Sequence, residues 1–417
     1  MKYRLKILVI LIVTIFINQS IDAQSNGHRF LHNVGVLDSL KSEILNETRT
    51  IYVQLPNSYN ENENRKYPVA YILDGEIFLP TVSNMLDFYS GGFIPEMVLI
   101  GVSNDKNRTR DLTPSHIKTK YGMPFNEENG EAANFIKFIE EQLIPFVEDK
   151  YPVTNYRTLI GHSYGGLFTI YSLINHPDLF ANYLAIDPSL DWDKQKLLKQ
   201  AEETFANKNY KGMSLFLSLS GQLHMQNSDI TIDNVMQDET DFTIFARSNI
   251  SFSNLIKKNS QNGLDFSWKF YPKDIHGTIA YPSIMDGLIS IFEWFQMENT
   301  DKINSFDTSK ETLLEIIKYR EMKLENHFGY QVSPYPEELL NMSGYMNMDM
   351  EQYEKAKMYF ELAIEYFPNS ANAYDSLSGY YDAKKDYVNA LKFAVKAYEL
   401  SDMDYYKNKV EDLKKKQ

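Results

Sequence analysis

Cysteine is absent from this sequence of 417 residues. Its absence excludes disulfide bonds, metal sites built from thiolates, a cysteine nucleophile and a lipid-carrying N-terminal cysteine. Basic residues are also scarce, with 42 lysines and arginines against 56 aspartates and glutamates, and they are spread thinly along the chain. The resulting formal net charge of −14 argues against a nucleic-acid partner.

The sequence also lacks the short motifs that hold common cofactors. It contains no HExxH zinc motif, no glycine-rich phosphate-binding loop and no calcium-binding loop, so no metal and no cofactor are predicted. The hydrophobic fraction of 43% is nevertheless enough for a sizeable core. A chain of this length has room for two or three domains of about 150 residues.

Long apolar runs are missing except near the N-terminus. There, the basic segment of residues 2–6 overlaps an apolar run at residues 5–17, which is short for a membrane span. A cleavage site is predicted after Ala23, so we interpret residues 1–23 as a signal peptide, with an uncleaved anchor as the alternative. The mature protein is expected to be exported, periplasmic or secreted, and without stable membrane insertion.

The most informative pattern is G-x-S-x-G at residues 161–165. An apolar run at residues 157–160 precedes it and favours a buried strand, while the run at 167–174 favours a helix. A serine on such a tight turn projects its hydroxyl out of the backbone, and both glycines let the strand and helix backbones come close. The context predicts Ser163 as a nucleophile; a glycine-rich turn without chemistry is the alternative.

Short apolar runs alternate with helical patterns over the first three quarters of the chain. The expected strands lie within residues 42–55, 67–73, 97–102, 157–160, 183–186, 215–220 and 265–271, and the expected helices at 132–151, 167–174, 194–207, 242–259 and 283–296. This alternation predicts an α/β fold with a mostly parallel sheet flanked by helices. Functional loops then belong at the carboxyl ends of the strands. Six residues fall there: Asp74, Asn104, Ser163, Asp187, Gly221 and His276.

The last quarter of the chain differs in composition and contains a repeat. Ala356 and Ala390 are 34 residues apart, as are Ala363 and Ala397. This period predicts a small all-α, tetratricopeptide-like helical-repeat region over residues 305–417, able to bind a protein partner. An unrelated helical hairpin is the alternative.

A serine hydroxyl attacks an ester only when a base accepts its proton, and a third group usually orients that base. His276 follows the last expected strand in a polar loop, and it is the predicted base. His224 is interpreted as a loop histidine, and His327 lies beyond the expected sheet.

The third member of the triad is expected between the strand at 215–220 and His276. Asp241, just before a predicted helix, is the favoured acid, with Glu239 and Asp238 as alternatives. A serine–histidine dyad without a strong acid also stays open.

An oxyanion needs two backbone N–H donors. One is expected from Tyr164, directly after the nucleophile, and the other from Gly75 or Glu76. The acidic side chains beside these donors are interpreted as structural, because negative charge there would oppose catalysis. Three residues are predicted to bind substrate, with solvated loop arginines and a core tryptophan as the alternatives: Arg108, Arg110 and Trp192.

Several motifs together resemble the putative esterase family, and most closely its siderophore-esterase-like branch. They are Leu73-Asp74-Gly75-Glu76, Arg110-Asp111-Leu112-Thr113-Pro114, Gly161-His162-Ser163-Tyr164-Gly165-Gly166, Asp187-Pro188-Ser189-Leu190 and His276-Gly277. The resemblance covers about residues 35–297. It implies an α/β-hydrolase fold without a cofactor, and ester hydrolysis in which Ser163 is the nucleophile and His276 the base.

The predicted organisation is a signal peptide at 1–23, an esterase domain at 30–297 and the helical region at 305–417. The function expected is that of an exported serine esterase acting on a small-molecule ester, of the siderophore type or an acylated sugar. An acyltransferase, or a non-catalytic scaffold acting with a partner of the helical repeats, are the alternatives. The presence of both Ser163 and His276 favours a catalyst over a scaffold.

Overall fold

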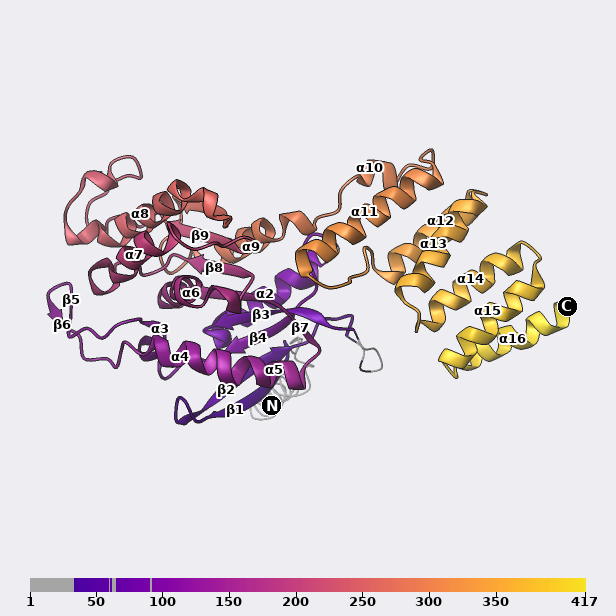
Figure 1. Ribbon diagram of the computed structural model, residues 1–417, viewed down its shortest axis with the longest axis horizontal. Helices are drawn as coiled ribbons and strands as arrows, with labels where there is room; N and C mark the ends of the chain where they lie inside the picture. Colours follow the sequence, from indigo (N-terminus) through magenta and orange to yellow (C-terminus); the bar gives the residue numbers. More distant parts are fainter. Residues whose placement is uncertain (1–33, 60, 62–64, 91) are drawn as a thin grey trace, which may run out of the picture. The chain divides into compact units, whose positions relative to one another are not determined.

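The computed structural model describes residues 34–59, 61, 65–90 and 92–417 (Figure 1). The predicted signal peptide, residues 1–23, lies outside these ranges. Residues 37–417 form one compact unit. None of the helices in the described ranges combines the length and the apolar character that crossing a membrane requires.

An eight-stranded sheet forms the centre of the first part of the chain. Its strands are β1 (Val36–Ser42), β2 (Glu47–Gln54), β3 (Tyr67–Leu73), β4 (Val98–Val102), β7 (Val153–His162), β8 (Asn182–Ile186), β9 (Ser214–Ser220) and β10 (Asp265–Tyr271). They lie in the order β1-β2-β4-β3-β7-β8-β9-β10. Strand β2 is antiparallel to β4, and the pairings from β4 to β10 are parallel. The expected α/β fold with a mostly parallel sheet is confirmed.

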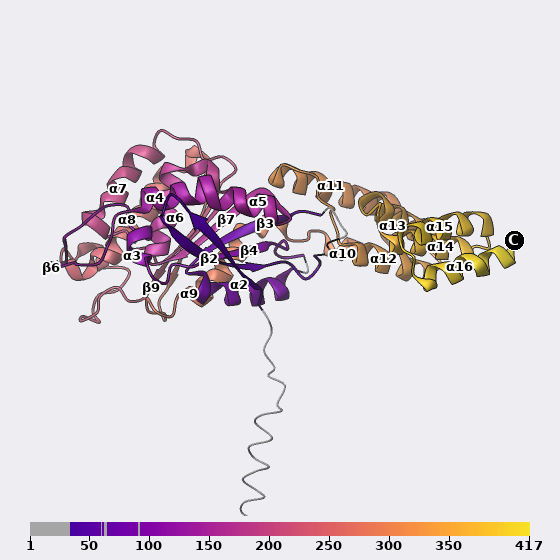
Figure 2. The same cartoon turned by 90° about the horizontal axis from the view of Figure 1, so that it is seen from below.

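Helices cover both faces of this sheet (Figure 2). They are α2 (Gly75–Tyr89), α3 (Arg108–Leu112), α4 (Ala132–Phe138), α5 (Ile144–Lys150), α6 (Tyr164–Asn175), α7 (Trp192–Phe205), α8 (Ile244–Lys258) and α9 (Ala280–Ile291). Helices α2 and α9 pack on one face, and α6 packs on the other with α4 and α7 beside it. Because both faces are covered, strands β3, β4 and β8 are buried along their whole length, as their apolar sequences predict.

Local differences from the expected elements have identifiable causes. The expected helix at 132–151 is divided by a π-helical turn, Ile139–Leu143, between α4 and α5. Helix α2 and strand β1 were not expected from the sequence. The side chains of β1 are mostly exposed or half-buried. The expected elements also do not include the hairpin of β5 (Thr119–Lys120) and β6 (Met123–Pro124), which is too short for a periodic signal.

Two close backbone approaches position the candidate site. A Cβ atom on Gly75 would lie 2.4 Å from the Cα atom of Gly101, so α2 can begin against β4 only because both residues are glycine. A Cβ atom on Gly161 would lie 2.2 Å from the carbonyl oxygen of Gly165. At Gly165 itself the nearest atom would be 3.6 Å away, so the expected crowding of strand and helix requires glycine at only one of the two motif positions.

The rest of the chain is all-helical, as expected. Its helices are α10 (Thr300–Ile303), α11 (Lys310–Phe328), α12 (Glu337–Asp349), α13 (Tyr353–Tyr366), α14 (Ala371–Ala383), α15 (Tyr387–Leu400) and α16 (Asp404–Lys416). Neighbouring helices α12 and α13 pack closely, because Gly344 lies against the ring of Phe360. The assignment to the tetratricopeptide type and the division between residues 297 and 305 stay predictions.

Helix α11 contacts the sheet region through aromatic side chains near its C-terminal end. The ring of Phe328 meets Tyr156 of β7 edge-on, with centroids 4.9 Å apart. His327 stacks on Trp294, with centroids 4.0 Å apart and an interplanar angle of 7°. This stacking agrees with the expectation that His327 lies beyond the sheet.

Candidate active site

Ser163 occupies the turn between strand β7 and helix α6. Its backbone has φ 61° and ψ −115°, a conformation that residues with a Cβ atom rarely adopt. The Ser163 amide donates to the carbonyl oxygen of Ile186 at the end of β8, which holds the turn in place (2.9 Å). The strained turn presents the hydroxyl group at the carboxyl edge of the parallel sheet, where ligands of α/β proteins bind.

A chain of hydrogen bonds runs from the Ser163 hydroxyl to a buried carboxylate. His276 Nε2 lies 3.0 Å from Ser163 Oγ, and His276 Nδ1 lies 2.7 Å from Asp187 Oδ2. Asp187 is fully buried, whereas the side chain of His276 is 37% exposed. The second carboxylate oxygen of Asp187 accepts from the amide of Ser220 at 2.9 Å, which fixes the orientation of the acid. The three residues have the geometry of a nucleophile–base–acid triad.

The position of the acid corrects the sequence prediction. Asp241 is exposed at the surface, and so is Glu239. Asp238 accepts hydrogen bonds from the backbone and hydroxyl of Thr240, so it stabilises its own loop. None of the three occupies the place beside His276 Nδ1 that Asp187 fills, because strand β8 ends directly next to β7. The expected chain order of nucleophile, acid and histidine is retained.

His224, which also follows the nucleophile in the sequence, has other contacts. His224 Nδ1 accepts hydrogen bonds from the amides of Gln226 and Asn227 at 3.0 and 2.9 Å. Its ring also packs against Phe242, with centroids 5.2 Å apart. These contacts agree with its interpretation as a loop histidine.

A second histidine supports the first. His162 Nε2–H donates to the backbone carbonyl oxygen of His276 at 2.9 Å, and the two rings lie 4.8 Å apart. Burial, reinforced by the neighbouring His276, lowers the pKa of His162 to about 4. His162 is therefore neutral at pH 7, and its single N–H holds the loop that carries His276.

The expected oxyanion donors lie at two neighbouring helix N-termini. Tyr164 begins α6, and Gly75 and Glu76 begin α2. The two helices follow β7 and β3, which are adjacent parallel strands. Since the first N–H groups of a helix have no acceptor within the helix, both N-termini favour negative charge at this edge of the sheet. Within the described residues, no cluster of three or more histidines and carboxylates is arranged to hold a metal ion.

The acidic side chains beside these donors are compensated. Asp74 is 2% exposed, and Arg108 binds its two oxygens through Nε and Nη2 at 2.8 and 2.9 Å. Burial raises the pKa of Glu76, and the charge of Asp74 contributes in the same direction. The guanidinium of Arg108 offsets the charge of Asp74 next to the expected oxyanion.

Arg108, which is predicted to bind substrate, makes its contacts with other parts of the protein. Besides Asp74 at the start of α2, its Nη2 contacts the carbonyl oxygen of His162 at 3.0 Å, directly before the nucleophile. The guanidinium therefore connects the two segments that carry the expected oxyanion donors. Its side chain remains 32% exposed.

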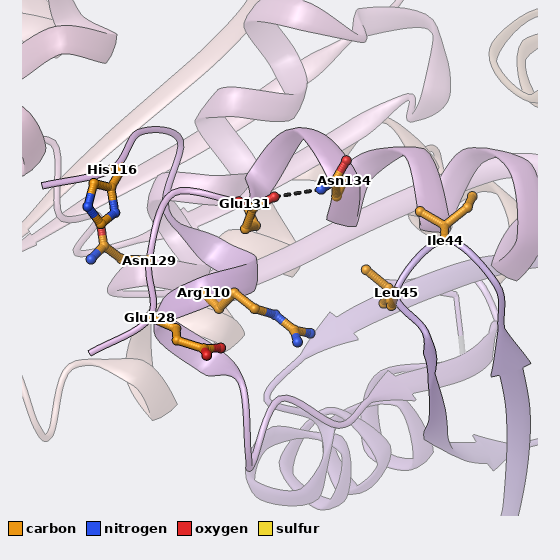
Figure 3. A pocket seen from close by; sticks show the side chains of 8 residues that line it. All are labelled: Ile44, Leu45, Arg110, His116, Glu128, Asn129, Glu131 and Asn134. Carbon is orange, nitrogen blue, oxygen red and sulfur yellow. Dashed lines mark hydrogen bonds between the residues drawn. The ribbon is translucent and has the colours of Figure 1, made fainter. Parts of the chain in front are cut away.

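Arg110 lies away from the triad. Its guanidinium is bound by Asp111 and Glu47, so both carboxylates compete with any substrate for its donors. Figure 3 shows Arg110 in a separate cavity of about 350 Å³. That cavity is lined by Ile44, Leu45, Arg110, His116, Glu128, Asn129, Glu131 and Asn134. None of the triad residues lines this cavity, so the binding of substrate by Arg110 stays a prediction.

Trp192 is buried, in agreement with the alternative of core packing. Only 2% of its surface is exposed, and its indole N–H donates to the carbonyl oxygen of Ser115 at 2.9 Å. Its ring meets Tyr164 edge-on, with centroids 5.3 Å apart. Trp192 thus supports the residue after the nucleophile from behind and does not form the pocket surface.

Comparisons with known proteins identify the family of this chain. The family model described as "Putative esterase" matches residues 42–267, which is more than half of the chain and ends shortly before His276. A ferri-bacillibactin esterase of Bacillus subtilis is 29% identical over 211 residues, covering 46% of this chain and 72% of the relative. A siderophore enterobactin esterase of Emericella nidulans is 40% identical over 119 residues, covering 27% of this chain and 38% of the relative.

A solved structure extends the similarity. The IroE-like serine hydrolase from Shewanella oneidensis superimposes with a TM-score of 0.64 at 27% sequence identity. It covers 79% of this chain and 99% of its own length. The protein is therefore similar to siderophore esterases in sequence and fold, and it belongs to the putative esterase family of serine carboxylic ester hydrolases.

Proposed function

We propose that the protein is an exported serine esterase that cleaves a small carboxylic ester through an acyl-serine intermediate. The observation that carries this proposal is the chain of hydrogen bonds from Ser163 through His276 to the buried Asp187. The substrate we propose is a siderophore-type ester, because the named relatives are siderophore esterases. An acylated sugar is the second substrate class.

The proposed reaction begins when Ser163 Oγ attacks the ester carbonyl carbon and His276 Nε2 takes the hydroxyl proton. The carbonyl oxygen becomes an oxyanion that accepts from the amide of Tyr164 and from one amide at the start of α2. His276 then gives its proton to the departing alkoxide, which leaves as an alcohol. A water molecule repeats the sequence, releasing the acid and restoring Ser163. Asp187 stabilises the imidazolium in both halves.

Labelling with a fluorophosphonate tests the nucleophile. We expect the protein without residues 1–23 to be labelled, and the variants Ser163→Ala and His276→Ala to lose labelling while keeping the wild-type circular dichroism spectrum. A folded wild-type protein that is not labelled would favour the non-catalytic scaffold. A Ser163→Ala variant that is still labelled would show that another residue is the nucleophile.

Product analysis distinguishes the substrates and the acyltransferase alternative. We expect a cyclic triester of a hydroxy acid, as a siderophore-type substrate, to be hydrolysed with a higher kcat/KM than an acylated sugar. Addition of a sugar alcohol should leave the free acid as the main product. A transferred ester as the main product would instead identify an acyltransferase.

Export is proposed from the N-terminal pattern of residues 1–23. Expression in a bacterial host, fractionation and N-terminal sequencing should yield a mature chain beginning at Gln24 outside the cytoplasm. A full-length chain that stays with the membrane fraction would support the uncleaved anchor.

The helical region is proposed to consist of tetratricopeptide-like repeats that bind a protein partner. In support, Ala356, Ala363, Ala390 and Ala397 are all fully buried, at equivalent positions of a 34-residue period. The variants Ala356→Leu and Ala390→Leu should then be destabilised by similar amounts, because the two alanines would occupy equivalent positions between two helices. Clearly unequal effects in urea unfolding would argue against a true repeat.

A further inference from the structure

A short hairpin places a lysine beside the residue that follows the nucleophile. Strands β5 and β6 are joined by Tyr121 and Gly122, which have φ values of 51° and 76°. Lys120, the last residue of β5, donates from its ammonium group to the hydroxyl of Tyr164 at 2.9 Å. The hairpin is thereby attached next to Ser163.

The ammonium group of Lys120 is surrounded by aromatic rings. It lies 5.3 Å from the ring centroid of Tyr121, 5.0 Å from that of Tyr164 and 5.4 Å from that of Trp192. Such contacts attract a cation to the faces of the rings, but they replace only part of the hydration that a charge loses on burial. Lys120 is a half-buried residue, and within the described parts of the chain its ammonium group is hydrogen-bonded to a hydroxyl and not to a carboxylate.

A second cation lies over the same aromatic ring. The guanidinium of Arg108 is 5.5 Å from the centroid of Tyr164. Arg108 is neutralised by both oxygens of Asp74, and the Tyr121 hydroxyl donates to the carboxylate of Asp191, whereas the positive ammonium group of Lys120 donates to the hydroxyl of Tyr164. This charge stands out in a protein whose formal net charge is −14. A local positive charge next to a catalytic serine attracts an anionic substrate group.

We propose that Lys120 is a specificity-determining residue that binds a negatively charged group on the aromatic acyl part of the ester. The proposal rests on the function proposed for Ser163. Tyr121, which is 51% exposed, supplies an aromatic surface beside the ammonium group for the acyl ring. The competing role is purely structural, with Lys120 only attaching the hairpin to Tyr164.

A pair of chromogenic esters of equal shape separates the two roles. The 4-nitrophenyl esters of 4-carboxybenzoic acid and 4-carbamoylbenzoic acid differ by one negative charge. We expect Lys120→Met to lower kcat/KM for the charged ester about tenfold, mainly through KM, because one charge-assisted hydrogen bond is lost. The uncharged ester should change by less than about twofold, since it lacks the interacting charge.

Two further variants serve as controls. Lys120→Arg should keep the preference for the charged ester, because it retains the positive charge. Lys118→Met removes an exposed lysine from the same segment and should leave kcat/KM for both esters unchanged. If the role of Lys120 is purely structural, Lys120→Met should lower kcat/KM equally for both esters.

Equal losses on both esters, or no loss on the charged ester, would overturn the proposed subsite. So would a wild-type enzyme that is labelled by a fluorophosphonate but hydrolyses only the uncharged ester or neither ester. Each of these results leaves the serine esterase intact. A folded wild-type protein that is not labelled at Ser163 would overturn the proposed function itself, and the subsite with it.

Discussion

His276 Nδ1 lies 2.7 Å from Asp187 Oδ2, although 89 residues separate the two side chains along the chain. Asp187 stands at the end of β8, one strand away from the nucleophile, and is fully buried. A buried carboxylate in this place keeps the Nδ1 proton on the imidazole and leaves Nε2 free to accept the proton of Ser163.

Replacing each carboxylate by its amide distinguishes the two candidate acids, Asp187 and Asp241. Asp187→Asn should lower kcat at least about 100-fold, because the amide no longer stabilises the imidazolium. Asp241→Asn should change kcat by less than about twofold, since it alters an exposed side chain. Steady-state hydrolysis of a 4-nitrophenyl ester measures both. A strong loss in Asp241→Asn together with an active Asp187→Asn would reverse the assignment.

The strained backbone at the nucleophile should affect stability. Ser163→Gly and Ser163→Ala both remove the hydroxyl, but only glycine adopts φ 61° without a Cβ clash. We expect the glycine variant to be more stable than the alanine variant by about 1 kcal/mol in urea unfolding. Neither should hydrolyse esters. Equal stabilities would mean that the turn stores no strain at this residue.

The buried imidazole of His162 should make stability depend on pH. Its pKa falls from an ordinary 6.5 to about 4 in the folded protein. Between these values the unfolded state binds more protons, so the contribution of His162 is complete above pH 6.5 and is lost as the pH falls toward 4. Over this window the loss amounts to roughly 3 kcal/mol.

The variant His162→Gln isolates this effect. Its amide can still donate to the carbonyl oxygen of His276 but does not titrate. Free energies of unfolding, measured for both proteins between pH 7.5 and about 4, should therefore fall more steeply for the wild type. Parallel profiles would contradict the lowered pKa of His162.

Arg108 should act on all substrates alike. Arg108→Met leaves the buried carboxylate of Asp74 without its partner, which should cost roughly 2 kcal/mol of stability. It also releases the contact to the carbonyl oxygen before Ser163, so kcat should fall for charged and uncharged esters in the same proportion. The double variant Asp74→Asn/Arg108→Met should regain part of the stability. A loss confined to anionic esters would instead restore the substrate-binding role first expected.

Several parts of the site follow from local sequence. The apolar strand, the G-x-S-x-G turn and the following helix are adjacent in the chain, so their pattern places Ser163 without knowledge of the rest. His276 can be predicted because few histidines follow the nucleophile and because it directly follows a strand. The alternation of buried strands with helices predicts the parallel sheet for the same reason, since each element leaves its own periodicity.

Asp241 is the wrong acid, because a position in the loop before His276 does not by itself bring a carboxylate to the imidazole. Asp187 follows a predicted strand, as Ser163 and His276 do. This shared position is the sequence signal for the acid. Sequence order alone does not reveal that β8 lies beside β7, and this neighbourhood brings Asp187 rather than Asp241 to the histidine.

The sequence by itself determined the fold class and the positions of Ser163 and His276 at strand ends, because these depend on local periodicity and on a compact motif. Only the tertiary structure decided the partners of the charged side chains. Arg108 is directed to Asp74, Arg110 to Asp111, and Lys120 to the ring of Tyr164. The physical reason is that a charged side chain interacts with whatever the folded chain places within a few ångströms, and the strand order of the sheet sets those neighbours.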